Sequence, residues 1–178
     1  RHAKAINFGL IYGMSSFGLS KSTGLSPAEA SAFVKAYFEQ FPKVKAFLDG
    51  LRITAAKQGY VQTIAGRKRY FPNLKREMNY NLRNREEREA INAPVQGTSA
   101  DILKAAMIRL PDELKRNGLK ASILLQVHDE LMLEVPEEEL ERTEEVVRDV
   151  MEHITTLSVP LSTEAKCGVN WGAMEKTR

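Results

Sequence analysis

The order of the sequence patterns predicts an α+β fold. Apolar residues recur at helical spacing in the first half of the chain, and two continuous apolar runs, 121–127 and 131–135, follow later with three polar residues between them. Helices that precede an antiparallel strand pair, rather than alternating with strands, are typical of this class. With 178 residues and 43% hydrophobic content, the chain can bury a core in one domain or two small ones.

The first helices have recognisable start signals. Residues 2–13 are expected to form a helix with glycines near its end. Ser26, Pro27 and Glu29 predict the start of a helix over 27–40, because serine caps a helix, proline suits its first turn and glutamate completes a capping box. Apolar residues follow helical spacing here, namely Ala30, Phe33, Val34, Tyr37, Phe38 and Phe41, and the aromatic ones among them are expected in the core.

A further helix and a short hairpin are expected next. Pro42 restarts the chain as a helix that runs to about residue 58 and ends at Gly59. Residues 60–64 and 68–71 then predict a hairpin around Ala65-Gly66.

The second half begins with one long helical pattern, over about 84–110, which Pro94 should bend or split because it lacks an N–H group. After the two apolar runs, Pro136 opens an acidic helix over 137–153, and 161–167 is a last strand candidate.

Charge is unevenly distributed although the net charge is only +3. Residues 67–88 hold eight basic and three acidic residues, residues 1–24 hold three basic and no acidic ones, and residues 137–152 hold eight acidic and two basic ones. Basic stretches are where a polyanion would bind, although solvated faces with local salt bridges explain them equally well. The single Cys167 excludes an internal disulfide and suits a reducing, cytosolic setting. No apolar run approaches the ~18 residues of a membrane span, so we expect no membrane partner.

The first group of candidate functional residues lies in the first helix. Steps of four place Lys4, Phe8 and Tyr12 on one helix face, where a cation could neutralise phosphate oxygens and rings could pack on a sugar or base. Gly9 and Gly13 would allow a ligand to approach closely. Spacing alone favours the plainer alternative of buried rings beside one solvated lysine.

The second group is Arg88, Asn92 and Gln96, again at steps of four. All three side chains can donate to the acceptors that every base pair presents in the minor groove, so they would sense duplex shape without reading sequence. A solvated helix face is an equally good interpretation from the spacing.

The third group, Gln126, His128, Asp129 and Glu130, lies between the two apolar runs and is expected at a hairpin turn. The strand period places Gln126 and His128 on one side and Asp129 on the other. Carboxylates at a tight turn suit a hard cation such as Mg²⁺, and a merely polar turn is the alternative.

A resemblance to a known family is carried by three segments, KAINFGLIYGMSSFGLS, REAINAPVQGTSADILKAAM and LLQVHDELMLEVP. In this order they resemble the fingers helix, the following palm helix and the palm hairpin of family A DNA polymerases, the bacterial DNA polymerase I type. The final GVNWGAMEK resembles the family's C-terminal end, so the likeness covers essentially the whole chain. It implies a helical fingers portion at 1–78 and a palm portion at 79–178 with an antiparallel sheet and packed helices.

The resemblance implies template-directed DNA synthesis in the bacterial cytosol or nucleoid, with primer–template DNA and dNTPs as partners. Lys4 would contact the nucleotide phosphates and is a candidate proton donor to pyrophosphate. Phe8 would pack on the nucleotide sugar, and Tyr12 would lie at the insertion site.

The remaining candidates take DNA and metal roles in this interpretation. Those expected to contact primer or template are Arg88, Asn92, Gln96, Gln126 and His128. Asp129 would be a catalytic metal ligand with Glu130 beside it, in a two-Mg²⁺ site whose second carboxylate lies outside this chain.

Two departures from the family pattern limit the expected activity. The chain begins at Arg1 without methionine, so we expect a piece of a longer protein. The family's phosphate-binding arginine would fall one residue before Arg1. The thumb and the first palm strands are expected in the remainder of the polymerase chain, as partners of this piece. We therefore expect little or no polymerase activity from the 178 residues alone. A DNA- or nucleotide-binding module without catalysis is the main alternative, and a metal-dependent phosphohydrolase built on His128 and Asp129 ranks below it.

Overall fold

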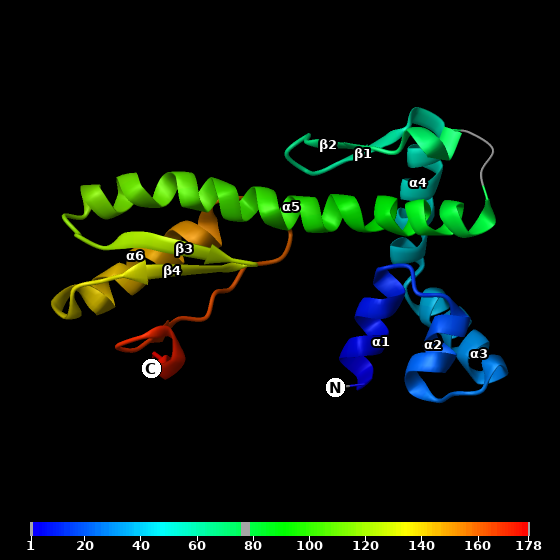
Figure 1. The fold of residues 1–178 in the computed structure, drawn as a ribbon, viewed down its shortest axis with the longest axis horizontal. Coiled ribbons are helices and arrows are strands. Elements are labelled where there is room, and N and C mark those ends of the chain that lie inside the picture. Colours follow the sequence, from blue (N-terminus) through cyan, green and yellow to red (C-terminus); the bar gives the residue numbers. More distant parts are fainter. Residues whose placement is uncertain (1, 76–78, 178) are drawn as a thin grey trace. The chain divides into compact units, whose positions relative to one another are not determined.

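The described part of the chain folds into helices and three antiparallel strand pairs (Figure 1). The computed structural model describes residues 2–75 and 79–177, with the side chains of residues 2–5 and 75 outside the described part. Its helices are α1 (His2–Ile11), α2 (Ser16–Thr23), α3 (Pro27–Gln40), α4 (Pro42–Gln58), α5 (Tyr80–Arg116) and α6 (Leu140–His153). Its strands are β1 (Tyr60–Gln62), β2 (Lys68–Tyr70), β3 (Ser122–Val127), β4 (Glu130–Glu134), β5 (Lys166–Cys167) and β6 (Glu175–Lys176). The predicted α+β class is confirmed.

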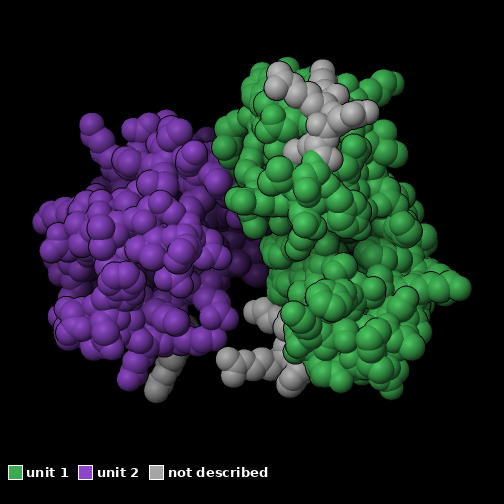
Figure 2. Space-filling model, turned by 45° about the vertical axis from the view of Figure 1, so that its right-hand side comes forward, with its two compact units in different colours: residues 1–98 green, residues 99–178 purple. Residues whose placement is uncertain are grey.

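Two compact units divide the chain, residues 1–98 and residues 99–178, which Figure 2 shows in different colours. The division falls inside α5, whereas the predicted boundary between fingers and palm, at 78/79, precedes that helix. The functional names of the two portions stay a prediction. Within the described residues, no helix is both long and apolar enough to cross a membrane.

The predicted starts of α3 and α4 are confirmed. Ser26 caps α3, since its hydroxyl accepts from the Glu29 N–H at 3.3 Å while the Glu29 carboxylate accepts from the Ser26 N–H at 2.9 Å. Helix α4 begins at Pro42 and ends before Gly59. Sequence reasoning missed α2, whose N-cap Ser15 accepts a hydrogen bond from the Gly18 N–H at 3.2 Å.

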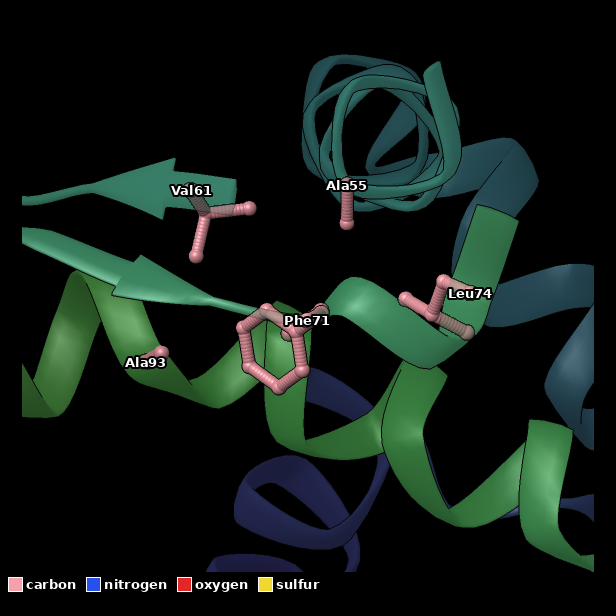
Figure 3. Close-up of a cluster of buried hydrophobic side chains, with 6 residues drawn as sticks. Ala55, Val61, Phe71, Leu74 and Ala93 are labelled. Carbon is pink, nitrogen blue, oxygen red and sulfur yellow. The ribbon is translucent and has the colours of Figure 1, made fainter. Parts of the chain in front are cut away.

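The core of the first unit joins α4, the β1–β2 hairpin and α5 (Figure 3). Its buried side chains are Ala55, Val61, Phe71, Leu74, Ala90 and Ala93. The hairpin is also held directly to α5, because the Arg67 guanidinium donates to the Gly97 carbonyl at 2.9 Å and the Ile64 N–H donates to the Thr98 hydroxyl at 3.1 Å. A methyl group placed on Gly97 would lie 2.6 Å from Cγ2 of Thr63, so this contact requires glycine.

The second unit packs the β3–β4 hairpin against α6 and the last turns of α5. Ile123 and Leu131 contact one buried cluster, formed by Ala106, Leu110 and Val150. Leu133 contacts the other cluster, formed by Leu114, Ala121 and Val146. The register shifts between Ile123 and Leu125, which leaves Leu124 as an extra residue in β3 and both Leu124 and Leu125 about half exposed.

Two local expectations differ from the structure. The long helix was expected to bend or split at Pro94, but it does not split, because α5 continues through Pro94 and also through Pro111. Pro94 is buried beside Ala93, so packing against the core offsets one lost backbone hydrogen bond. The last strand is limited to Lys166–Cys167, and it pairs with β6, which was not predicted.

The aromatic face of α3 was also expected to be buried, but only its Ala30 is. Phe33 and Phe41 are 42% and 47% exposed. Helical spacing therefore identified one face of α3 correctly as apolar without showing how much of that face is covered.

Candidate nucleic-acid interface

Helix α1 presents an aromatic pair at its C-terminal end. Phe8 is 46% exposed, and its ring stacks on that of Tyr12 with centroids 6.0 Å apart and planes 29° apart. The Lys4 backbone is helical, but its side chain lies outside the described residues, so its phosphate-binding role stays a prediction. The rings form a partly exposed face rather than the buried one of the plainer alternative.

The end of α1 is fixed by a glycine turn that contacts α5. The Gly13 N–H donates to the Leu10 carbonyl at 3.0 Å, and the Met14 N–H donates to the Gly9 carbonyl at 2.8 Å, which is the pattern of a Schellman cap. Gly13 has a φ of +79°, and a Cβ there would lie 3.1 Å from Cγ of Arg88. The turn that ends α1 therefore contacts Arg88 of the second group within the first unit.

The second group lies along one stripe of α5. Arg88 is exposed, and its Nε donates to the Asn84 carbonyl at 3.3 Å; no carboxylate in the described part of the chain forms an ion pair with it. Asn92 is half-buried, and its Oδ1 is buried without a hydrogen-bond partner in the described residues, whereas Gln96 is exposed. A buried acceptor without a donor is costly, by about 1–3 kcal/mol, so a donor supplied by a ligand would be favourable there.

Arg88 differs from the other arginines near it. Arg69 and Arg85 both contact Glu89, at 2.8 and 3.2 Å, and Arg83 contacts Glu87 at 2.9 Å. These pairs are the local salt bridges of the alternative interpretation of the basic stretch, and they neutralise much of its charge locally. The guanidinium of Arg88 remains available to an external anion or acceptor.

The third group lies at the β3–β4 turn, as predicted. His128 and Asp129 form a two-residue connection between Val127 and Glu130, which pair with each other. Among the described residues, His128 is the only non-glycine residue with positive φ, at 55°. No residue pattern predicted this conformation, which L-residues adopt at a cost of about 1–2 kcal/mol.

The predicted alternation of sides does not hold at this turn. The Gln126 side-chain amide donates to the His128 carbonyl at 2.5 Å, so it stabilises the turn. The strand period that placed Gln126 with His128 ends at Val127, where the chain reverses. His128, Asp129 and Glu130 are all exposed.

Carboxylates at the turn fit a hard cation only in part. Asp129 and Glu130 offer the oxygen donors that Mg²⁺ prefers. No group of three or more His, Cys, Asp or Glu side chains that could hold a metal exists among the described residues. This part of the chain therefore supplies a portion of a coordination sphere, and it lacks the ligand cluster that the phosphohydrolase alternative requires.

Two contacts that support the interface were missed from the sequence. The close approach of Gly97 to Thr63 fixes the hairpin beside Gln96, and the Tyr37 hydroxyl donates to the Asn7 side chain at 2.6 Å, tying α3 to α1. The Gly97 contact could have been predicted from a glycine in the interior of a helix, because glycine destabilises a helix and is expected there only where another group approaches closely. The hydrogen bond between Tyr37 and Asn7 corresponds to no comparable sequence pattern.

Comparison with known proteins agrees with this arrangement. Residues 1–173 match the model of DNA polymerase family A. The chain therefore belongs to DNA polymerase family A, and the resemblance carried by the three segments is confirmed.

Its relatives include DNA polymerase I of Pseudomonas aeruginosa, which is 50% identical over 171 residues, and that of Bacillus subtilis, which is 47% identical over the same length. Each match covers 96% of this chain but 19% of the relative, so the chain spans about a fifth of the length of these proteins. A similar solved structure is the POL domain of Pol1 from M. smegmatis in complex with DNA primer-template and dNTP, with 43% identity and a TM-score of 0.86. The likeness covers 91% of this chain and 28% of that one.

Proposed function

We propose that this chain supplies nucleotide- and primer–template-binding surfaces to a DNA-directed DNA polymerase. The whole enzyme would join deoxynucleotides from dNTPs to a primer 3′-hydroxyl and release pyrophosphate in the bacterial cytoplasm. One observation carries the proposal beyond family membership. The glycine turn that ends α1 packs against Arg88, so the helix proposed to bind the nucleotide and the stripe proposed to bind duplex DNA meet in one unit.

The proposed chemistry of the first unit follows from its side chains. The Lys4 ammonium would pair with phosphate oxygens, and the partly exposed Phe8 ring would pack on the sugar. Tyr12, stacked on Phe8, would lie at the insertion site. Arg88 and Asn92 would donate to the base acceptors of the minor groove, as would Gln96 one turn further along α5.

In the second unit, Gln126 and His128 would lie near the primer terminus. Asp129 and Glu130 would give oxygen ligands to Mg²⁺, which would supply charge neutralisation at the triphosphate and a lowered pKa for the primer hydroxyl. Because the described residues supply only part of such a site, we propose that the 178-residue chain alone does not catalyse synthesis.

Primer extension tests the proposed inactivity. The 178-residue chain is incubated with primer–template, dNTPs and Mg²⁺, and no extended product is expected. Robust templated synthesis would show that the isolated chain completes the site. A matched reaction with a full-length bacterial DNA polymerase I confirms that the substrates are competent.

Duplex binding tests the α5 stripe. Arg88→Ala is expected to weaken the binding of a labelled primer–template about tenfold, because it removes a guanidinium that no described carboxylate engages. Arg83→Ala, on the same helix but paired with Glu87, serves as the matched control and is expected to change affinity less than about twofold. Affinity should also fall steeply with salt, since phosphate contacts release counterions. Equal effects of the two substitutions would contradict the minor-groove assignment.

A further inference from the structure

The β1–β2 hairpin has two faces with different surroundings. Its register pairs Tyr60 with Tyr70, Val61 with Arg69 and Gln62 with Lys68. Because paired residues share a face and successive residues alternate, Val61 and Arg69 lie on one face and the other four residues lie on the opposite one. We call the face formed by Tyr60, Gln62, Lys68 and Tyr70 the outer hairpin face.

The residues of the opposite face pack against the rest of the first unit. Val61 is 1% exposed in the core of the first unit, and the Arg69 guanidinium forms its ion pair with Glu89 of α5. Thr63, beyond the end of β1, is buried against Gly97. The residues of this opposite face therefore hold the hairpin on α5. The outer hairpin face is positioned by these contacts, and its own side chains are not needed for them.

The outer hairpin face is an exposed aromatic and cationic surface. The rings of Tyr60 and Tyr70 lie 5.8 Å apart between centroids, tilted by 55°, and Tyr70 is 67% exposed. The Lys68 ammonium lies 4.4 Å from the centroid of the Tyr60 ring. Gln62 is exposed beside Lys68 and adds an amide that can donate and accept hydrogen bonds.

The sequence segment around the hairpin is basic. Between Asp49 and Glu77 the sequence contains seven Lys or Arg residues and no Asp or Glu. Arg52 and Arg69 are engaged with Asp49 and Glu89. A surface with an exposed tyrosine and a lysine held over a second ring, in a sequence segment without Asp or Glu, is complementary to a flexible polyanion that carries flat rings.

We propose that the outer hairpin face binds single-stranded nucleic acid without sequence preference. A base stacks on the exposed ring of Tyr70, and the Lys68 ammonium contacts a neighbouring phosphate while its position over Tyr60 limits its freedom. This surface differs in chemistry from the α5 stripe proposed to bind duplex DNA, since the stripe offers hydrogen-bond donors at helical spacing and the hairpin offers ring faces.

Binding of a labelled oligothymidylate of about 12 nucleotides to the 178-residue chain tests the proposal. Tyr70→Ala is expected to raise the dissociation constant about tenfold, and Tyr70→Phe, which keeps the ring, to change it less than about twofold. Tyr80→Ala is the matched control, because Tyr80 is 76% exposed in the same unit but lies outside the hairpin. Circular dichroism of each variant reports whether the fold is retained.

Three outcomes would overturn the proposal. The first is that Tyr70→Ala and Tyr80→Ala alter oligothymidylate affinity equally, or not at all. The second is that inorganic polyphosphate binding falls as much as oligothymidylate binding in Tyr70→Ala, which would mean that charge and not stacking is recognised. The third is that Tyr70→Phe loses as much affinity as Tyr70→Ala, which would assign the contact to the hydroxyl.

The two binding surfaces are distinguished by testing each variant with the ligand of the other surface. Arg88→Ala should retain oligothymidylate affinity, and Tyr70→Ala should retain affinity for a blunt-ended duplex, which has no single-stranded template. Loss of duplex binding in both variants would contradict the separate hairpin site. Failure of the Arg88 prediction alone would leave the hairpin result unaffected.

Discussion

The two units present their candidate residues on different kinds of support. In residues 1–98, Phe8 and the Arg88 stripe lie on helices whose close contacts depend on glycine, at Gly13 and Gly97. In residues 99–178, the candidates lie on a two-residue turn that places His128 at positive φ. A helix fixes the spacing of its side chains through local geometry, whereas the turn depends on strand register and on a strained backbone. Backbone changes should therefore be tolerated least at the glycine contacts in the first unit and at the β3–β4 turn in the second.

Removing a core ring from the first unit is expected to have the largest effect. Phe71 is 4% exposed among small neighbours, so Phe71→Ala should lower the free energy of unfolding by about 3–5 kcal/mol. Chemical denaturation measures the loss, and hydrogen exchange should show it first in residues 1–98. Phe47→Ala, which truncates a ring that is 52% exposed, is the control and should cost far less. Equal loss of protection in both units would show that they do not unfold separately.

A pair of glycine substitutions tests whether close packing holds the hairpin on α5. Gly97→Ala places a methyl group 2.6 Å from the buried Thr63 side chain and should destabilise the first unit by about 1–2 kcal/mol. Gly50→Ala, inside α4, meets nothing within 4 Å and should stabilise by about 0.5–1 kcal/mol through helix propensity alone. Thermal unfolding of both variants gives the comparison. A stabilising Gly97→Ala would mean that the hairpin shifts freely.

Local signals in the sequence predicted most element starts. The Ser26–Glu29 capping box, the restart at Pro42 and the His128–Asp129 reversal are determined by neighbouring residues, and each was confirmed. Continuity of α5 through Pro94 depends instead on burial against distant residues, which a local rule cannot include.

The candidate groups show the same division. Spacing placed Arg88 and Gln96 on one exposed stripe, but the contact of Arg88 with Gly13 joins residues 75 positions apart and leaves no periodic signal. The exposure of the α3 rings is another tertiary property, because an apolar face has the same sequence pattern whether it is covered or not.

Acid should loosen the C-terminal segment of the second unit, the smallest effect that we expect. Arg148 of α6 forms ion pairs with Glu144 and Glu152 at 2.5 and 3.8 Å and donates to the Thr163 carbonyl. The Glu144 carboxylate also accepts from the Thr177 hydroxyl at 3.0 Å, and that of Glu152 accepts from the Thr163 N–H at 2.6 Å. These bonds tie the last residues to α6.

The direction of the pH dependence follows from the pKa values of the two glutamates. The hydrogen bond from Arg148 is the main cause that lowers the pKa of Glu144 from 4.5, and the backbone hydrogen bond from Thr163 is the main cause that lowers the pKa of Glu152. A lowered pKa in the folded state means that the unfolded state binds more protons near this pH. The stabilisation is therefore complete above about pH 4.5 and is lost as the pH falls through the folded-state values.

Limited proteolysis of the C-terminal segment, from neutral pH down to about pH 3 with an acid-active protease, measures this attachment. The wild-type segment should become cleavable below about pH 4.5. Arg148→Met should make it more readily cleavable at neutral pH, because the ion pairs with both carboxylates and the bond to the Thr163 carbonyl are lost, and should weaken the pH dependence that comes from Glu144. Arg109→Met is the matched control, since Arg109 pairs with Glu113 four residues on in α5, and it should retain the wild-type profile. If Arg148→Met and Arg109→Met behave alike, the C-terminal segment is held by its β5–β6 pairing and apolar contacts rather than by the glutamates.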